Sequence, residues 1–319
     1  MADATVRYLS RADVEAVGLS GTDVIEILEA AFRAKRAGDV ELPPKIGVHP
    51  RDDAFIHAMP AYLSDSDVVG LKWVAGYPGN KALGVPYLHG LLVLSDAATG
   101  RPLAVMDATW ITEVRTAAAS VLGIRALAGD GIESVGIVGC GRQGTVHLEL
   151  AGEVFPGLRR ASLFDVHRDR AEALAAAHPG LDVKVASGPE ELGPGTQVLI
   201  SCAPIVRKPE RPIRRAQLAD ASVACAVDFD ATLSEDLFDD AGLFVVDDVA
   251  QYRYYRQQGY FAGYPPDAIE LADLLAGDAP APRGLNVYVP LGIAIEDVAV
   301  ASEVERRAAE AGLGTELPL

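Results

Sequence analysis

The feature that most constrains the fold is a glycine-rich run at 139–144 (GCGRQG), which stands between a short apolar run and a stretch with helical periodicity. At this spacing, Gly139 allows a tight turn, Gly141 lets the backbone approach a pyrophosphate, and Gly144 lets the helix pack closely on its strand. Asp165 closes the next apolar run, where an acid can accept hydrogen bonds from an adenine ribose. Together these features predict a dinucleotide-binding turn.

Asp165 favours NAD over NADP, because a carboxylate repels a 2′-phosphate. His167 and Arg168 follow directly, and Arg168 is either a phosphate contact or a solvated arginine in a first helical turn, so NADP is kept as an alternative. The candidate cofactor contacts in this part of the chain are Gly139, Gly141, Arg142, Gln143, Gly144, Asp165, Arg168, Cys202 and Ala203.

Beyond residue 128 the sequence alternates between short apolar runs and stretches with helical periodicity. This alternation is typical of an α/β fold with a doubly wound parallel sheet, the Rossmann type. The expected strands lie at 134–138, 161–164, 183–186, 197–201, 223–227 and 243–246.

The first part of the chain follows a different pattern. Helical spacing up to Gly38 gives way to strand-like runs from 45 to 106, which predict an antiparallel sheet, and 110–128 predicts a buried helix. We therefore predict two domains, with a boundary between residues 128 and 129. A strand-like run and one long helix, at 292–311, end the chain.

The charge composition of the chain limits the classes of partner that it can bind. The chain has 28 Lys and Arg residues against 45 Asp and Glu residues, a formal net charge of −17. Polyanions are held by clustered cations, so we expect neither nucleic acid nor an anionic membrane as a partner. Three cysteines without a CxxC pair predict no disulfide scaffold and no metal site. A charged N-terminal stretch, with no apolar run near the roughly 18 residues of a membrane span, predicts a cytoplasmic protein.

Three charged residues stand in otherwise apolar settings. Lys72 lies in a strand-like run, where a lysine either serves a site or protects an edge strand from aggregation. Arg115 lies on an apolar stripe of the predicted helix, where a guanidinium needs a carboxylate from the protein or from a ligand. Asp228 follows the run at 223–227, where it either faces a ligand at the carboxyl ends of parallel strands or caps a helix.

A cluster of tyrosines lies at 252–264. Packing of a loop into the core is the favoured interpretation, and a subunit interface or a substrate lid are the alternatives. Its members are Tyr252, Tyr254, Tyr255, Tyr260 and Tyr264.

Nearly end to end, the chain resembles the ornithine cyclodeaminase and mu-crystallin family of NAD(P)-dependent enzymes. The motifs that carry the resemblance are 70–72 (GLK), 96–100 (DAATG), 112–118 (TEVRTAA), the glycine-rich run and 292–297 (GIAIED). The resemblance implies that residues 1–128 bind substrate and form a homodimer through their sheet, that 292–319 return to this domain, and that 129–291 bind NAD(P).

The resemblance also implies roles for single residues. Arg115 would bind the substrate carboxylate, Lys72 would contact the substrate, and Asp228 would handle amine protons. Thr116 would touch the cofactor phosphates. Lys45 falls where a second carboxylate-binding arginine is common, and it keeps the charge without the bidentate fork.

Tyr87 stands where the family has small or polar residues, and it is a further candidate substrate contact. The implied reaction is hydride transfer at the α-carbon of an α-amino or α-imino acid, similar to that of ornithine cyclodeaminase. An amino acid dehydrogenase, a ketimine or imine reductase of the same family, and a non-catalytic NAD(P)H-binding protein are the alternatives.

Overall fold

A computed structural model describes residues 5–51 and 53–319, and contacts between Cα atoms divide the chain into two compact units. Unit 1 comprises Met1–Arg115 and Gly292–Leu319, and unit 2 comprises Thr116–Leu291. The first boundary therefore falls inside helix α3 (Thr109–Ala128), and not after residue 128 as the sequence predicts. A helix that continues through a boundary carries no turn signal there, which is why the sequence pattern misplaces it.

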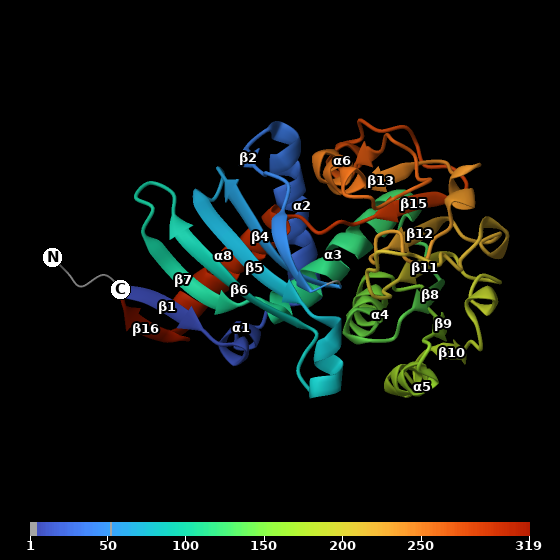
Figure 1. Cartoon of the computed structure of the whole chain (residues 1–319), viewed down its shortest axis with the longest axis horizontal. Coiled ribbons are helices and arrows are strands. Elements are labelled where there is room, and N and C mark those ends of the chain that lie inside the picture. The colour runs from blue at the N-terminus through green and yellow to red at the C-terminus, as the bar shows by residue number, and fades with distance from the viewer. Residues whose placement is uncertain (1–4, 52) are drawn as a thin grey trace. The chain divides into compact units, whose positions relative to one another are not determined.

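Unit 1 is built on an eight-stranded sheet in the order β16-β1-β7-β6-β5-β4-β2, with β3 also paired to β4 (Figure 1). The strands are β1 (Thr5–Leu9), β2 (Val40–Glu41), β3 (Ile46–Arg51), β4 (Ala54–Leu63), β5 (Val68–Gly76), β6 (Leu88–Asp96), β7 (Pro102–Asp107) and β16 (Thr315–Pro318). Strands β4 to β7 form the predicted antiparallel sheet. Strand β1, which the sequence did not indicate, pairs parallel to β7 and antiparallel to β16.

Helices cover one face of this sheet. They are α1 (Arg11–Ala16), α2 (Gly21–Ala37) and α8 (Ala294–Ala311), and η1 (Pro78–Leu83) is a short 3-10 segment. Helix α8 packs on β4, β5 and β6, and α2 packs on α8. The absence of a side chain at Gly70 permits this packing, because a Cβ there would lie 2.6 Å from a methyl of Val298.

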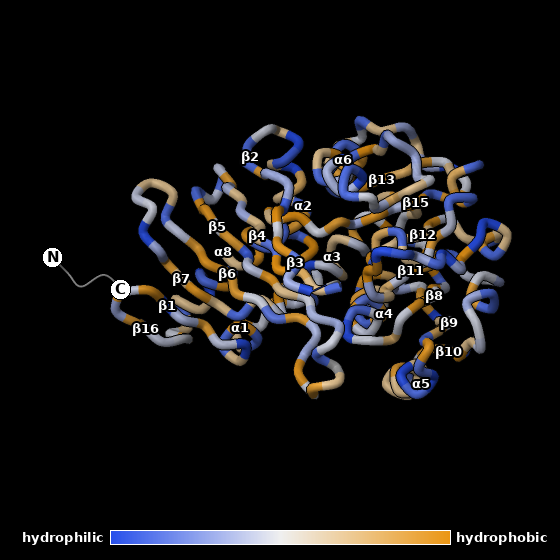
Figure 2. The backbone as a smooth tube through the Cα atoms, in the orientation of Figure 1, coloured by the Kyte–Doolittle hydropathy of each residue, from blue (hydrophilic) through white to orange (hydrophobic). Residues whose placement is uncertain are grey.

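Unit 2 contains an eight-stranded sheet whose described pairings are all parallel, in the order β10-β9-β8-β11-β12-β15-β13-β14. The predicted doubly wound parallel sheet is confirmed. The strands are β8 (Ser134–Val138), β9 (Arg160–Phe164), β10 (Asp182–Val185), β11 (Val198–Ser201), β12 (Val223–Ala226), β13 (Phe244–Val246), β14 (Ile269–Glu270) and β15 (Asn286–Val289). Figure 2 shows hydrophobic residues along the central strands of this sheet.

The connecting elements of unit 2 are α4 (Arg142–Val154), α5 (Arg168–Ala177), α6 (Val249–Gln257), α7 (Leu271–Ala276), η2 (Pro189–Glu191), η3 (Arg215–Gln217) and η4 (Glu235–Phe238). From β8 the chain winds outward to β9 and β10, and it then returns to the other side of β8 with β11 and β12. The gap between β8 and β11 is thus the topological switch point, where open parallel sheets bind their ligands. Of the helices in the described part of the chain, none has both the length and the apolar character to cross a membrane.

Candidate functional site

The glycine-rich turn of unit 2 lies at the switch point, between the end of β8 and the start of α4. Gly139 has a φ of +85°, and a Cβ there would lie 2.7 Å from the Cys202 carbonyl oxygen. A Cβ on Gly144 would lie 2.1 Å from the carbonyl oxygen of Gly139. A Cβ on Gly141, by contrast, would meet no atom within 4 Å, so open space adjoins the N-terminus of α4. These features fit the binding of a pyrophosphate by backbone N–H groups.

Asp165 ties the end of β9 to this turn. One of its carboxylate oxygens accepts a hydrogen bond from the Cys140 N–H and the other accepts one from the His167 N–H, each at 2.8 Å. Each oxygen keeps a second lone pair for a ribose hydroxyl. The sequence pattern indicated an acid at this place but not its second task of holding the turn.

The neighbouring cofactor candidates differ in exposure. Arg168 is exposed in the first turn of α5, and its Nε donates to Glu172 at 2.8 Å, as expected of a solvated arginine. Arg142 is exposed at the start of α4, whereas Gln143 is partly buried. Thr116 begins unit 2, and its carbonyl oxygen accepts a hydrogen bond from the Ser120 hydroxyl at 2.9 Å.

Asp228 follows β12 and is 1% exposed. Its carboxylate accepts hydrogen bonds from the hydroxyls of Ser201 at 2.8 Å and Thr232 at 3.1 Å, and from the Ala203 N–H at 3.3 Å. Burial raises the pKa of Asp228 to about 7, against the lowering effect of these hydrogen bonds. The helix-cap alternative is wrong, because Ser234 occupies the position before η4. Asp228 is a buried acid that can take up or release a proton near neutral pH.

Asp228 is also linked to the glycine-rich turn. A Cβ on Gly139 would also lie 3.1 Å from the backbone nitrogen of Ala203. The N–H of Ala203 donates a hydrogen bond to the Asp228 carboxylate. The backbone of Cys202 and Ala203 therefore lies between the turn and the acid. Cys202 is partly buried, with its Sγ 3.9 Å from Nδ1 of the buried His147.

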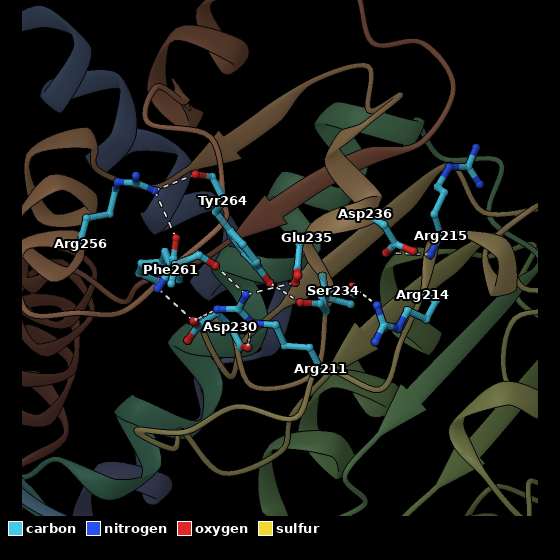
Figure 3. Close-up of polar contacts among 12 residues, drawn as sticks. Arg211, Arg214, Arg215, Asp230, Ser234, Glu235, Asp236, Arg256, Phe261 and Tyr264 are labelled. Carbon is cyan, nitrogen blue, oxygen red and sulfur yellow. Dashed lines mark hydrogen bonds and ion pairs between the residues drawn. The ribbon is translucent and has the colours of Figure 1, made fainter.

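The tyrosine cluster packs into the core of unit 2, which confirms the favoured interpretation. Tyr252, Tyr255 and Tyr264 are at most 6% exposed, and Phe261 is fully buried among them. Figure 3 shows Arg211 and the Phe261 N–H both directed at the carboxylate of Asp230, which fixes this loop. The interface and lid alternatives are not supported, since these rings contact one another.

In unit 1, Lys72 is 1% exposed on β5, which lies between β4 and β6. The edge-strand alternative is therefore wrong. Lys72 Nζ donates to Oδ1 of Asp297 at 2.6 Å. Burial and the nearby Arg115 charge lower the pKa of Lys72 to about 8, against the opposing effect of Asp297.

Arg115 is 6% exposed, and its carboxylate partners come from the protein itself. Its Nη1 donates to Oε2 of Glu296 at 2.7 Å, and its Nε donates to Oδ1 of Asp297 at 3.0 Å. Lys45, 9% exposed, donates to the Gly292 carbonyl oxygen at 3.3 Å. With every group ionised, these three cations and two carboxylates leave a surplus of one positive charge. A role of Arg115 toward a substrate carboxylate remains a prediction.

Sequence reasoning missed Glu296 and Asp297 as members of this cluster. Both are fully buried in the first turn of α8, and burial raises the pKa of Glu296. Among the residues that the structure describes, Glu296 Oε1 and Asp297 Oδ2 have no hydrogen-bond partner. Two adjacent acids in the apolar first half of the helix at 292–311 were the available signal, because buried carboxylates need cations nearby.

His57 and Tyr87 are two further residues of unit 1. His57 on β4 is kept neutral, because burial and the charges of Lys45, His49 and Lys72 lower its pKa to about 3. Tyr87, the predicted substrate contact, precedes β6 and is 38% exposed. Within residues 5–51 and 53–319, no group of three or more His, Cys, Asp or Glu side chains is placed to hold a metal ion.

Comparison with known proteins places this geometry in context. The model of the ornithine cyclodeaminase/mu-crystallin family matches residues 6–312. The nodulation efficiency protein NfeD of Rhizobium meliloti is 34% identical over 320 residues, which cover 98% of each chain. The Δ1-pyrroline-2-carboxylate reductase of Thermococcus litoralis, solved with NADH and L-proline, has a TM-score of 0.85 at 27% identity and covers 98% of this chain and 100% of its own. An archaeal alanine dehydrogenase dimer with bound NAD has a TM-score of 0.87 at 27% identity, with 99% of both chains covered.

Proposed function

The chain belongs to the ornithine cyclodeaminase/mu-crystallin family, and from this premise we propose that it is an NAD(P)-dependent enzyme that transfers hydride at the α-carbon of an α-amino or α-imino acid. The observation that carries the proposal is the link between the glycine-rich turn and a buried acid. Burial raises the pKa of Asp228 to about 7. Asp228 accepts a hydrogen bond from the Ala203 N–H, whose nitrogen would lie 3.1 Å from a Cβ on Gly139. A proton-transfer group beside a dinucleotide turn is what such a reaction needs.

Unit 2 is the cofactor-binding part of the enzyme. The pyrophosphate would lie on the N–H groups at the start of α4, beside Gly141, and Asp165 would accept hydrogen bonds from the ribose. Arg142, Gln143, Thr116, Cys202 and Ala203 complete the proposed contacts, and Arg168 is the residue that would favour a 2′-phosphate. When bound, the nicotinamide ring supplies or accepts the hydride.

Unit 1 is the substrate-binding part. Its surplus positive charge suits an amino or imino acid, whose carboxylate would be held by Arg115 and Lys45. Lys72 would contact the substrate in its charged form, and Tyr87 would lie near its side chain. Asp228 would take the amine proton when hydride leaves the α-carbon and return it in the reverse direction.

The two neighbours at 27% identity support a single hydride transfer. One was solved with NADH and L-proline, and the other is an alanine dehydrogenase with bound NAD. A cyclodeaminase would add attack by a side-chain amine and return of the hydride. Purified protein should be incubated with NADH or NADPH and a panel of cyclic imines and keto acids with amines, and separately with NAD+ or NADP+ and basic amino acids. Nicotinamide absorbance and product mass are the readouts. An absorbance change identifies a reductase or dehydrogenase, and loss of ammonia without net absorbance change identifies a cyclodeaminase. If no member is converted, the result favours the alternative of a protein that binds the cofactor without turnover.

Cofactor preference follows from Asp165. Asp165→Ala should weaken NADH binding by about 1 to 3 kcal/mol, because ribose hydroxyls lose their acceptor. Since Asp165 also holds the Cys140 and His167 N–H groups, part of this loss would come from the turn. Arg168→Ala is the matched control and should leave NADH binding unchanged. Tenfold tighter binding of NADPH than of NADH by the unmodified protein would contradict the preference for NAD.

A homodimer would form through the sheet of unit 1. Gly70 and Lys72 point to the face covered by α8, whereas Trp73 and Leu91, cross-strand neighbours on the other face, are 47% and 43% exposed. Pro60, Leu71 and Val93 lie in one cross-strand row beside them. An apolar sheet face of this kind needs a cover, and a second copy of the chain is the partner that the dimeric neighbour suggests.

The dimer is tested by light scattering. The unmodified protein should give a particle of twice the 33.6 kDa chain mass, and Trp73→Glu with Leu91→Glu should give a monomer. Val166→Glu, at an apolar residue of unit 2 that is 84% exposed, is the control and should remain dimeric. A monomeric unmodified protein at micromolar concentration would refute this proposal.

We also place the protein in the cytoplasm. Cys140, Cys202 and Cys225 are free thiols in the described chain, and reducing compartments preserve this state. The partners would then be a small amino or imino acid and the nicotinamide cofactor.

A further inference from the structure

We propose that Asp297 is a positioning residue for the transfer, which ties the Lys72 ammonium and the Arg115 guanidinium to one carboxylate oxygen. This inference rests on the proposed function. Oδ1 of Asp297 accepts from Lys72 Nζ at 2.6 Å and from Arg115 Nε at 3.0 Å. Because both cations share this atom, its position sets the separation and orientation of the two groups proposed to meet the substrate.

The surroundings make this arrangement rigid. Asp297 is fully buried, and Lys72 and Arg115 are 1% and 6% exposed, so little water competes for these hydrogen bonds. Asp297 lies in the first turn of α8, where the helix dipole favours negative charge. On the guanidinium, Nη1 is held by Glu296 and lies 2.7 Å from where a Cβ of Gly292 would be. The backbone at the start of α8 thus limits the movement of Arg115.

Asp297 also keeps Lys72 charged. The titratable groups that face Lys72 are Asp297, Arg115, Glu296 and His57. Arg115 disfavours the ammonium, and His57 carries no charge at neutral pH. Without the Asp297 carboxylate, the pKa of Lys72 should fall from about 8 toward neutrality. Burial and Arg115 lower this pKa, and the Glu296 carboxylate would be left to raise it.

The test compares Asp297→Asn with Glu296→Gln, which removes the neighbouring carboxylate but no hydrogen bond to Lys72. Asp297→Asn should lower kcat/KM by about tenfold to a hundredfold, since both cations lose their common anchor. The alkaline limb of its pH profile should move to lower pH by about one unit. Glu296→Gln should move that limb less. If Asp297→Asn has the wild-type kcat/KM and pH profile while the wild type turns over substrate, the positioning role is refuted and the proposed function stands.

A second measurement needs no substrate. A lysine whose folded pKa lies below its unfolded value adds stability as pH rises from the folded to the unfolded pKa, because only the unfolded chain then binds the proton. The free energy of unfolding should therefore begin to rise at lower pH in Asp297→Asn than in the wild type, and this difference should vanish in a Lys72→Met background. Equal onsets would refute the charge-holding role, whether or not the wild type shows turnover.

Asp297→Glu covers the case in which the asparagine variant does not fold. It keeps the charge but displaces the oxygen, so the alkaline limb should stay in place while kcat/KM falls by about tenfold. An unchanged kcat/KM in a folded Asp297→Glu variant would show that the position of the oxygen does not matter.

Discussion

Replacing Asp228 with asparagine is expected to lower kcat by about a hundredfold to ten-thousandfold, the usual contribution of a positioned acid or base. Asparagine fills the same space and can exchange hydrogen bonds with the Ser201 and Thr232 hydroxyls, which can turn to accept them. The contact with the Ala203 N–H is kept where the amide oxygen of asparagine takes the place of the carboxylate oxygen that accepts it. The loss should therefore appear in kcat, with NADH affinity nearly unchanged.

The pH dependence separates this role from a structural one. In the oxidative direction the rate should rise as pH rises through about 7, the pKa of Asp228, because only the ionised carboxylate accepts the amine proton. The pKa of Asp228 in the folded state lies above the unfolded value of 3.8, so the folded state binds the proton more tightly. The free energy of unfolding should therefore fall as pH rises from about 4 to about 7, because the folded state loses this advantage. Asp228→Asn should lack this decline, which urea unfolding across this pH range would measure.

Ser201→Ala tests the role of Asp228 while keeping its carboxylate. It removes a hydrogen bond that lowers the pKa of Asp228, so the inflection of the rate should move to higher pH. If Asp228→Asn turned over substrate at the wild-type rate, Asp228 would be a structural acid, and the proton would have to be handled by another group.

Arg115→Lys is expected to lower kcat/KM by about tenfold to a hundredfold, the effect of losing a charge-assisted hydrogen bond of roughly 1.5 to 3 kcal/mol. Arg115 uses Nε and Nη1 to hold two carboxylates at once, and a lysine has a single nitrogen at the end of its side chain. The charge is kept, so the variant should fold and bind NADH. The loss should appear mainly as a raised KM for the amino or imino acid.

The control is Arg125→Lys, in the last turn of the same helix α3. It should leave kcat/KM and KM unchanged. Arg115→Met should instead destabilise the protein by about 3 to 5 kcal/mol, because Glu296 and Asp297 would lose a buried cation. If Arg115→Lys kept full kcat/KM on every carboxylate substrate, Arg115 would serve only as the ion-pair partner of these acids.

Much of unit 2 could be predicted from the sequence, because its signals are local. The glycine-rich turn, the acid at Asp165 and the alternation of short apolar runs each depend on neighbouring residues, and the structure has the turn and the parallel sheet at the expected places. Asp228 was identified for the same reason, since its position after an apolar run identifies the carboxyl end of a strand.

The charge cluster of unit 1 could not be predicted in the same way. Arg115 and Glu296 are 181 residues apart, and no periodic pattern tells which carboxylate reaches which cation across that separation. The apolar surroundings of Arg115 in the sequence indicate that it needs a carboxylate. They do not indicate which residue or ligand supplies that carboxylate. The pairing of β1 with β16 was missed for a similar reason, because these short strands come from opposite ends of the chain and β16 is exposed.

Hydride transfer to the α-carbon can be followed by the transfer of an isotope from the cofactor to the product. The protein should be incubated with NADH or NADPH that carries deuterium at both C4 positions of the nicotinamide ring, together with each imine and keto acid of the panel. The amino acid product should be analysed by mass spectrometry and NMR. Hydride transfer from the cofactor would give a product that carries one deuterium at its α-carbon, formed in step with cofactor oxidation. Asp228→Asn should form this product about a hundredfold to ten-thousandfold more slowly. A product whose α-hydrogen comes from the solvent, or cofactor oxidation without any such product, would contradict hydride transfer to the α-carbon.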